Sequence, residues 1–235
     1  MNAIIEFLQA AGVFLLFLAA RFALLLVVLA ALAVVFLAGL AVARVAGRVR
    51  RHSLGLSRVE GLTWRDRVYY APGHAWLRWA GDRSVRVGLD DLAQHVFSRI
   101  TEVALPQLGQ VVQAGEGSVL VRAGRRQASI PSPVGGKVVA INRRVLRRPS
   151  LLHTDPYAGG WLFAVEPTEQ GYTRLPYGEP AKKWFAAEAQ RFSAFIEHQL
   201  GVAAADGGEL VAPGPTLLSD EQWEEVTREF LNAKA

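Results

Sequence analysis

An uninterrupted apolar run near the N-terminus constrains this chain more than any other feature. From Phe22 to Ala43 the sequence contains no charged residue. As a helix this run would extend roughly 33 Å at about 1.5 Å per residue, which is enough to cross the apolar core of a bilayer. A helix also satisfies its own backbone hydrogen bonds, as a segment exposed to lipid must do. The sequence therefore predicts a membrane anchor over residues 1–47, with the span at 22–43.

Arginines on one side of the span predict its orientation. Only Arg21 precedes the run closely, whereas four arginines follow it: Arg44, Arg48, Arg50 and Arg51. The positive-inside rule then predicts a single-pass protein of a bacterial-type inner membrane, with its C-terminal body in the cytoplasm. A cleaved signal peptide is disfavoured, because a basic n-region is missing and the apolar stretch exceeds the usual ~7–15 residues.

Residues 3–20 are also apolar and leave two alternatives open. They could form a second span in a hairpin, or an interfacial or partner-facing helix before a single span. No Pro-Gly turn separates them from the main run, which favours the single span.

Charge and cysteine content limit the remaining possibilities. The net charge is about +4 over residues 1–60, +6 over 61–168 and −5 over 169–235. A basic body with an acidic tail suggests an anionic surface as partner for the body. The absence of cysteine excludes disulfides and thiolate metal sites, but it does not fix the compartment.

The body is predicted to be mainly β. After a basic linker at residues 48–67, short apolar runs alternate with turn residues from 68 to 168, apart from a helical turn at 90–100. Many short strands with frequent turns indicate a small sandwich or barrel. Within it, the tip at Gly124–Arg126 joins two strands and projects long side chains into solvent.

The C-terminal region is predicted to hold two helices. Residues 169–200 include a helix from Glu179 to Leu200, with Pro180 at its first turn and an aromatic stripe that either packs on the body or docks a partner helix. A flexible linker at 201–218 leads to a short amphipathic helix at 219–233, which begins with a Ser219–Gln222 capping box.

Several strings give the body a specific resemblance. They occur in order at 69–79 (YYAPGHAWLRW), 87–94 (VGLDDLAQ), 100–116 (ITEVALPQLGQVVQAGE), 130–142 (IPSPVGGKVVAIN) and 151–163 (LLHTDPYAGGWLF). Together they resemble the H protein of the glycine cleavage system over about residues 68–167. The resemblance implies a lipoyl/biotinyl-type flattened barrel, a barrel-sandwich hybrid. It also implies a carrier whose lipoyl-lysine moves an aminomethyl group among the P, T and L proteins.

The chain departs from that family at the position that carries the cofactor. The family's lysine lies seven residues before the Ser-Pro-Val turn, which is Arg125 here, and the acidic residue of the family motif is replaced by Arg122. A guanidinium remains protonated and delocalised, so it cannot form the lipoyl amide. The nearest lysine, Lys137, lies beyond that turn in the next strand. We therefore expect an unmodified Arg125 and no cofactor.

Exposed arginines are the remaining site candidates. A segment after residue 142 carries four arginines at helical i, i+1, i+4, i+5 spacing, and they either face solvent or contact lipid headgroups or an acidic protein. The predicted contacts with an anionic surface are Arg122, Arg125, Arg126, Arg143, Arg144, Arg147 and Arg148. The sequence offers no recognition element for nucleic acid.

Other polar residues point to structural roles. The five histidines lack metal-ligand spacing, and His74 and His153 belong to the family-like strings. Asp90 and Asp91 fit a helix N-terminus better than acid–base catalysis. No set of nucleophile, base and orienting group can be assembled, so the sequence predicts no enzyme activity and no metal site.

The leading hypothesis is a membrane-anchored, non-lipoylated H-protein-like scaffold that binds an unknown protein through its hairpin face or its tail helices. Two alternatives stay open. One is a carrier subunit that still serves glycine cleavage. The other is a membrane-fusion-type adaptor, whose family places its body outside the cytoplasm and inserts a helical hairpin at the barrel tip. The orientation of the span and the five-residue tip from Arg122 to Arg126 argue against that adaptor.

Overall fold

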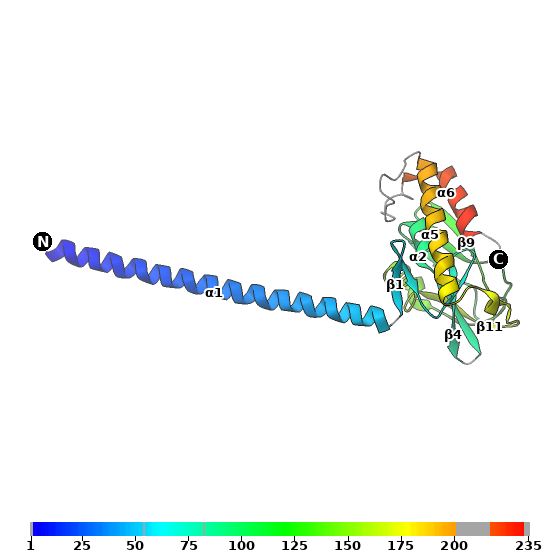
Figure 1. The fold of residues 1–235 in the computed structure, drawn as a ribbon, viewed down its shortest axis with the longest axis horizontal. Helices are drawn as coiled ribbons and strands as arrows, with labels where there is room; N and C mark the ends of the chain where they lie inside the picture. The colour runs from blue at the N-terminus through cyan, green and yellow to red at the C-terminus, as the bar shows by residue number, and fades with distance from the viewer. Residues whose placement is uncertain (1, 54, 82, 201–216, 233–235) are drawn as a thin grey trace. The chain divides into compact units, whose positions relative to one another are not determined.

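Helix α1 (Asn2–Ser53) is unbroken in the computed structural model, which describes residues 2–53, 55–81, 83–200 and 217–232 (Figure 1). Its 52 residues extend roughly 78 Å at about 1.5 Å each. No proline precedes Pro72, so nothing removes a hydrogen bond from the helix ladder. The hairpin alternative for residues 3–20 was therefore wrong, since they continue the same helix.

The chain divides into two units, Met1–Ser53 and Leu54–Ala235. In the first, the apolar side chains of α1 are exposed, and a candidate membrane span covers Phe14–Ala46. It contains the predicted span at 22–43 and begins earlier, because the apolar residues before Arg21 belong to the same helix.

The second unit begins with a hairpin where a linker was expected. Strands β1 (Leu56–Val59) and β2 (Leu62–Arg65) pair antiparallel through a turn at Glu60 and Gly61, both with positive φ. Such two-residue turns match the twist of a hairpin. Leu62 and Trp64 point into the core, so the linker predicted at 48–67 was wrong over these strands.

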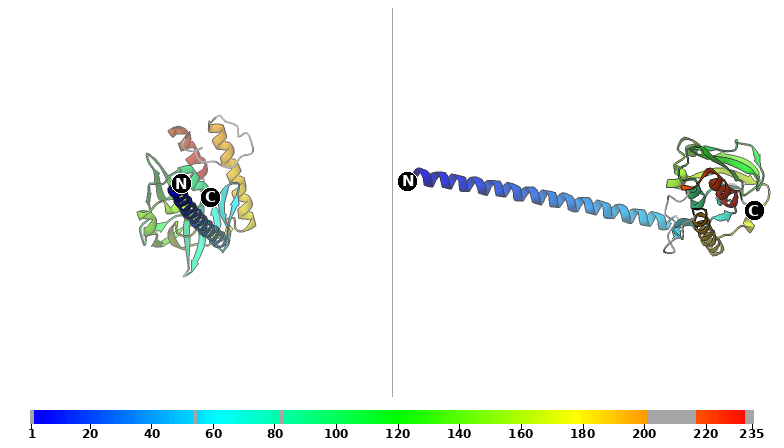
Figure 2. Two further views of the ribbon diagram at one scale, coloured as in Figure 1. Left: turned by 90° about the vertical axis from the view of Figure 1, so that its left-hand side faces the viewer. Right: turned by 90° about the horizontal axis from the view of Figure 1, so that it is seen from above.

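Two further sheets enclose the core of the body (Figure 2). A six-stranded sheet has the order β3-β4-β5-β11-β10-β7, and a three-stranded sheet has the order β6-β8-β9, with all pairs antiparallel. Alternate residues of both sheets are buried, as in Val85 and Val87 of one and Val119 and Val121 of the other. The strands are β3 (Tyr69–Ala71), β4 (Ala75–Gly81), β5 (Ser84–Leu89), β6 (Glu102–Ala104), β7 (Val111–Val112), β8 (Gly117–Ala123), β9 (Arg126–Pro131), β10 (Gly136–Ile141) and β11 (Trp161–Pro167).

Short helices fill the connections between the strands. Asp90 caps the first of them by accepting a hydrogen bond from the Ala93 backbone N–H, which confirms its predicted place at a helix N-terminus. These helices are α2 (Asp91–Phe97), α3 (Arg143–Arg147) and α4 (Leu151–Thr154), and the 3₁₀ turn η1 (Gly171–Arg174) follows the last strand and precedes the C-terminal helices.

Two C-terminal helices pack side by side on the body (Figure 1). Helix α5 (Glu179–Leu200) has the predicted bounds and contacts β1, β2 and β3. Helix α6 (Asp220–Val226) begins at the predicted capping box and continues into the π-helical turn η3 (Thr227–Leu231), which contacts β9 and α2. The predicted linker at 201–218 lies almost wholly outside the described residues.

The aromatic stripe of α5 faces inward. Phe185, Phe192 and Ile196 belong to the core cluster together with Trp223 and Phe230 of the last helical segment. The idea that these helices offer free apolar docking faces was therefore wrong, because each covers the apolar face of the other and of the body.

Candidate functional site

The hairpin of β8 and β9 presents the position at which the family resemblance predicts a lipoyl-lysine. Ala123 pairs with Arg126, so only Gly124 and Arg125 form the turn, fewer than the five residues expected. Gly124 has a φ of +64°, as a glycine in the first central position of a type II′ turn has. The Arg125 side chain is exposed at this tip. A two-residue turn also leaves no room for the helical hairpin that the adaptor alternative requires.

The arginines on either side of the tip are held by neighbouring groups. Arg122 donates from Nη1 to Glu102 on the adjacent strand β6 at 2.6 Å. Arg126 pairs with Asp220 at 3.2 Å, donates to the Leu218 carbonyl, and lies 5.6 Å from the ring centroid of Trp223. Arg126 therefore connects the start of α6 to the β8–β9 hairpin through these contacts, instead of facing the predicted anionic surface.

The hairpin tip does not fit a lipoyl group, because it offers no amine. Among the described residues, the lysines lie elsewhere in the body. Lys137 is on β10, opposite Glu166 of β11 and Val111 of β7, and Lys182 and Lys183 are on α5.

The four arginines after residue 142 are exposed, as the sequence predicts. Asn142 caps α3 by accepting from the Arg144 backbone N–H at 3.1 Å, and Val145 fixes the inner face of the helix by burial. α3 contacts β6, the strand beside β8. The structure thus brings this basic helix to the sheet that carries Arg125. The exposed set is Arg143, Arg144, Arg147 and Arg148.

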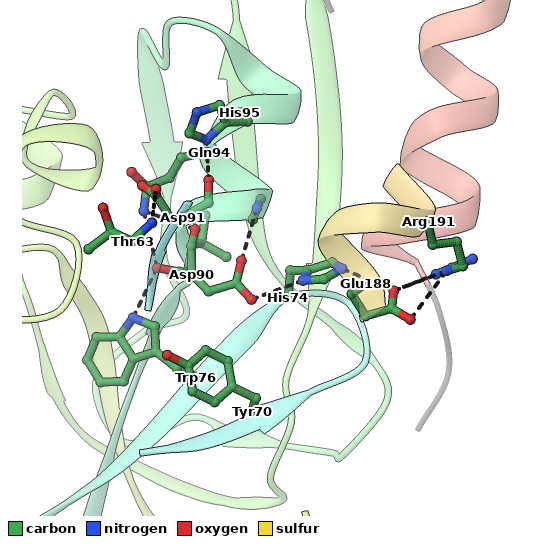
Figure 3. A network of polar contacts seen from close by, with 12 residues as sticks. Thr63, Tyr70, His74, Trp76, Asp90, Asp91, Gln94, His95, Glu188 and Arg191 are labelled. Carbon is green, nitrogen blue, oxygen red and sulfur yellow. Dashed lines mark hydrogen bonds and ion pairs between the residues drawn. The ribbon is translucent and has the colours of Figure 1, made fainter. Parts of the chain in front are cut away.

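A buried ionic cluster is the polar feature that the sequence did not reveal (Figure 3). His74 lies in the β3–β4 turn with a φ of +57°, and its side chain is 1% exposed. Its Nδ1 is 2.9 Å from Asp90 Oδ2, and its Nε2 faces Glu188 Oε2 at 3.6 Å. Arg191 donates to Glu188 at 2.7 Å and also pairs with Glu229.

The opposite charges of this cluster stabilise one another in their charged forms. Complete burial lowers the pKa of His74, but the charges and hydrogen bonds of Asp90 and Glu188 outweigh burial and raise that pKa to about 9. Burial also disfavours the charged form of Glu188 and so raises its pKa, but hydrogen bonds from His74 and Arg191 outweigh burial and lower that pKa to about 2. The imidazolium and the carboxylate are therefore both charged at neutral pH.

The cluster joins four parts of the body instead of forming a reaction site. It connects the β3–β4 turn, the start of α2, helix α5 and η3, and the rings of Trp184 and Phe230 lie beside His74 at 5.5 and 6.3 Å. Because the imidazole is enclosed, its charge positions the C-terminal helices on the sheets. The sequence signal was present only as isolated acidic and basic residues far apart in the chain.

The other polar candidates lie apart from this cluster. His153 Nε2 accepts from the Ile100 backbone N–H at 3.4 Å, a structural contact. Within the part of the chain that the structure describes, no three histidine or acidic side chains are grouped to hold a metal. The absence of catalytic activity stays a prediction.

Comparisons with known proteins identify the body. Residues 68–185 match the family described as glycine cleavage H-protein. The glycine cleavage system H protein of Deinococcus deserti is 38% identical over 110 residues, which cover 47% of this chain and 88% of that protein. That of Thermus thermophilus is 36% identical over 107 residues, covering 46% and 82%.

A solved structure is also similar to part of this chain. The crystal structure of a glycine cleavage system H protein from Mycobacterium marinum is 31% identical, with a TM-score of 0.44, and covers 46% of this chain and 89% of that one. The matched residues run from the start of β3 into α5, so α1 and α6 lie outside the family region. The ordered strings, the family match over residues 68–185 and the H proteins of Deinococcus deserti and Thermus thermophilus agree: the chain belongs to the glycine cleavage H-protein family, with a lipoyl-type barrel-sandwich fold.

Proposed function

We propose that the protein is a membrane-anchored, non-lipoylated H-protein-like binding module on the cytoplasmic face of the membrane. The observation that carries the proposal is Arg125 at the tip of the β8–β9 turn. A carrier needs a nucleophilic amine at this tip, and a guanidinium does not provide one. The hairpin keeps the shape of a carrier arm but lacks its reactive group.

The anchor supports the membrane part of the proposal. The side chains of α1 between residues 14 and 46 are apolar and exposed, apart from Arg21 and Arg44. Exposed apolar surface of this extent is unfavourable in water and favourable in lipid. The arginines after residue 43 orient the body toward the cytoplasm. A reporter fused to the C-terminus should be active only as a cytoplasmic fusion, and activity of a periplasmic reporter would contradict the orientation.

Intact-mass measurement of the purified full chain tests the proposal at Arg125. The protein is expressed in lipoate-supplemented cells beside a lipoylated H protein as positive control. We expect the unmodified mass for this chain. An adduct on any lysine would contradict the proposal and support a carrier role in glycine cleavage.

The variant Arg125→Lys is the matched comparison. It restores an amine at the same tip while keeping the charge and the turn. Modification of this variant alone would show that the hairpin is otherwise accessible, and that the guanidinium prevents lipoylation in the natural chain.

A binding module also needs a partner. The apolar faces of α5 and α6 are buried, so we place the partner on the exposed hairpin tip or on the exposed face of α3. Capture from detergent extracts with the natural chain and with Arg125→Ala should yield a partner that the variant loses. Equal recovery of the partner with both chains would show that the partner does not bind at the hairpin tip.

A further inference from the structure

We propose that Arg65, Arg78 and Arg86 form an anion-binding site that takes a phosphate group. The three side chains come from β2, β4 and β5. The proposal does not depend on the lipoylation state of the chain, and its residues belong to other elements than the hairpin tip and α3.

The register of the β4–β5 hairpin brings two of the guanidinium groups together. Arg78 lies directly opposite Arg86, and the next pair on the same face is Trp76 opposite Gly88. The indole of Trp76 covers Gly88 so closely that a Cβ there would lie 2.4 Å from the ring. Trp76 thus fills the position next to the arginine pair on this face of the hairpin. Arg78 and Arg86 are both half-buried.

Aromatic rings fix the guanidinium groups in place. The Arg78 guanidinium lies 5.9 Å from the ring centroid of Trp76, and that of Arg86 lies 4.9 Å from the ring centroid of Trp161. Cation–π contacts of this kind hold a guanidinium while leaving its N–H groups free to donate at its edge.

Arg65 adds a third positive charge, which acts on Arg78. Its side chain is 9% exposed, and Nη1 donates to the Tyr157 carbonyl. The Tyr157 ring is 5.9 Å from that of Trp76, which links Arg65 to the hairpin face. The ionisable groups acting on Arg65 are Tyr70, Asp155 and Tyr157, and only Asp155 carries a negative charge at neutral pH.

Arg78 and Arg86 have no balancing carboxylate among the described residues, whereas Asp155 acts on Arg65. Among the described residues, neither Arg78 nor Arg86 forms an ion pair with a carboxylate. Burial, together with the charges of Arg65 and Arg86, lowers the pKa of Arg78 to about 10. Like charges directly opposite each other on neighbouring strands destabilise a sheet. A bound anion would remove this repulsion, which is the physical reason for assigning a site here.

Phosphate is the anion that fits this donor set. A guanidinium presents parallel N–H groups that match two oxygens of one phosphate, and several guanidinium groups together suit its charge. The same chemistry is found in inorganic phosphate and in the headgroup of an anionic phospholipid, which a membrane-anchored body would meet. The test separates these two sources.

The experiment measures thermal unfolding of the full chain in neutral detergent micelles. Inorganic phosphate is titrated at constant ionic strength against chloride. In a second arm, a short-chain phosphatidylglycerol is compared with the matching phosphatidylcholine. We expect one anion to raise the midpoint by about 3–6 °C at a tenfold excess over its Kd, and further with the logarithm of its concentration.

Two variants that remove equal charge give the control. Arg78→Gln/Arg86→Gln should abolish the rise, whereas Arg99→Gln/Arg174→Gln, at two exposed positions outside the site, should retain it. Arg78→Gln alone should also raise the midpoint without any ligand, because it removes the repulsion. This last result distinguishes the site from a variant that merely fails to fold.

Each outcome decides the proposal. A rise with inorganic phosphate that Arg78→Gln/Arg86→Gln abolishes identifies a small-anion site, and such a rise with phosphatidylglycerol alone identifies a headgroup site. No rise with either probe, or the same loss in both double variants, would overturn the proposal. Binding of polyglutamate but neither phosphate probe would also overturn it, in favour of an acidic protein partner.

Discussion

His74 shows how much a single buried charge can depend on its neighbours. Asp90 and Glu188 both face its ring, and Asp90 is fully buried. Removing one partner of a buried pair leaves the other charge uncompensated, which typically costs about 3–5 kcal/mol. His74 thus contributes to stability chiefly by satisfying the acidic groups around it.

We expect His74→Asn to lower the free energy of unfolding of the body by about 3 kcal/mol. Asparagine tolerates the positive φ at this position, so the loss reports the charge more than the backbone. Urea unfolding followed by tryptophan fluorescence measures it. The matched control is His198→Asn, an exposed position on α5, where no change is expected. Equal stability of the two variants would contradict the role assigned to His74.

The same residue predicts how stability depends on pH. The folded-state pKa of His74, about 9, lies above its ordinary value of 6.5. Its contribution is therefore complete below about pH 6.5 and is lost as the pH rises through about 9. The stability of the natural chain should fall across this window, and His74→Asn should flatten the fall. A pH-independent stability from 6.5 to 9 in the natural chain would refute the raised pKa.

Glu188 acts at the other end of the pH scale. Its folded-state pKa of about 2 lies below the ordinary value of 4.5, so its contribution to stability is present above pH 4.5 and is lost as the pH falls toward 2. Because Glu188 is partly exposed, solvent screening reduces this contribution relative to that of His74.

At the scale of elements, the last helical segment, α6 and η3, packs against the β8–β9 hairpin and holds the end of the chain there. Ser219 and Gln222 form a capping box, and the Trp223 indole N–H donates to the Val96 carbonyl at 3.1 Å. Arg126 joins the segment to β9. The short helix is stable in this position because it buries its apolar face, not because of its intrinsic propensity.

We expect Ser219→Ala to destabilise the body by about 1 kcal/mol, since it removes the cap that orders the first turn of α6. Ser219→Asp should retain most of the stability, because aspartate also caps. Thermal unfolding of both variants measures the difference, and hydrogen exchange of the β9 amides should rise in the alanine variant. Unchanged hydrogen exchange in β9 would show that α6 and η3 do not stabilise the β8–β9 hairpin.

At the scale of the whole molecule, the two units differ in where their apolar side chains lie. The body gathers a buried apolar core, whereas α1 exposes apolar side chains between Phe14 and Val45. Most of the stability of the body therefore resides within Leu54–Ala235.

We expect removal of residues 1–53 to release the body from membranes and to leave its unfolding midpoint within about 2 °C of that of the full chain in detergent. Fractionation followed by alkaline carbonate extraction tests the first part. The full chain should stay in the membrane pellet and the shortened chain should remain in the supernatant. Extraction of the full chain by carbonate would contradict an integral anchor.

The sequence by itself determined the features that depend on local pattern. The apolar run predicts the long exposed helix, the ordered strings place the chain in its family, and the spacing to the Ser-Pro-Val turn puts Arg125 at the hairpin tip. Caps at Asp90 and Ser219 were also readable, because a cap acts within three residues.

Only the tertiary structure decided which distant residues meet. His74, Asp90, Glu188 and Arg191 converge from separate elements, and no spacing in the sequence encodes that contact. The pairing of Arg78 with Arg86 depends on strand register, which a shift of one residue would destroy. The direction of the aromatic stripe on α5 depended on whether the body offered it a surface to cover. Local patterns fix elements, whereas long-range packing and register fix the charges that act together.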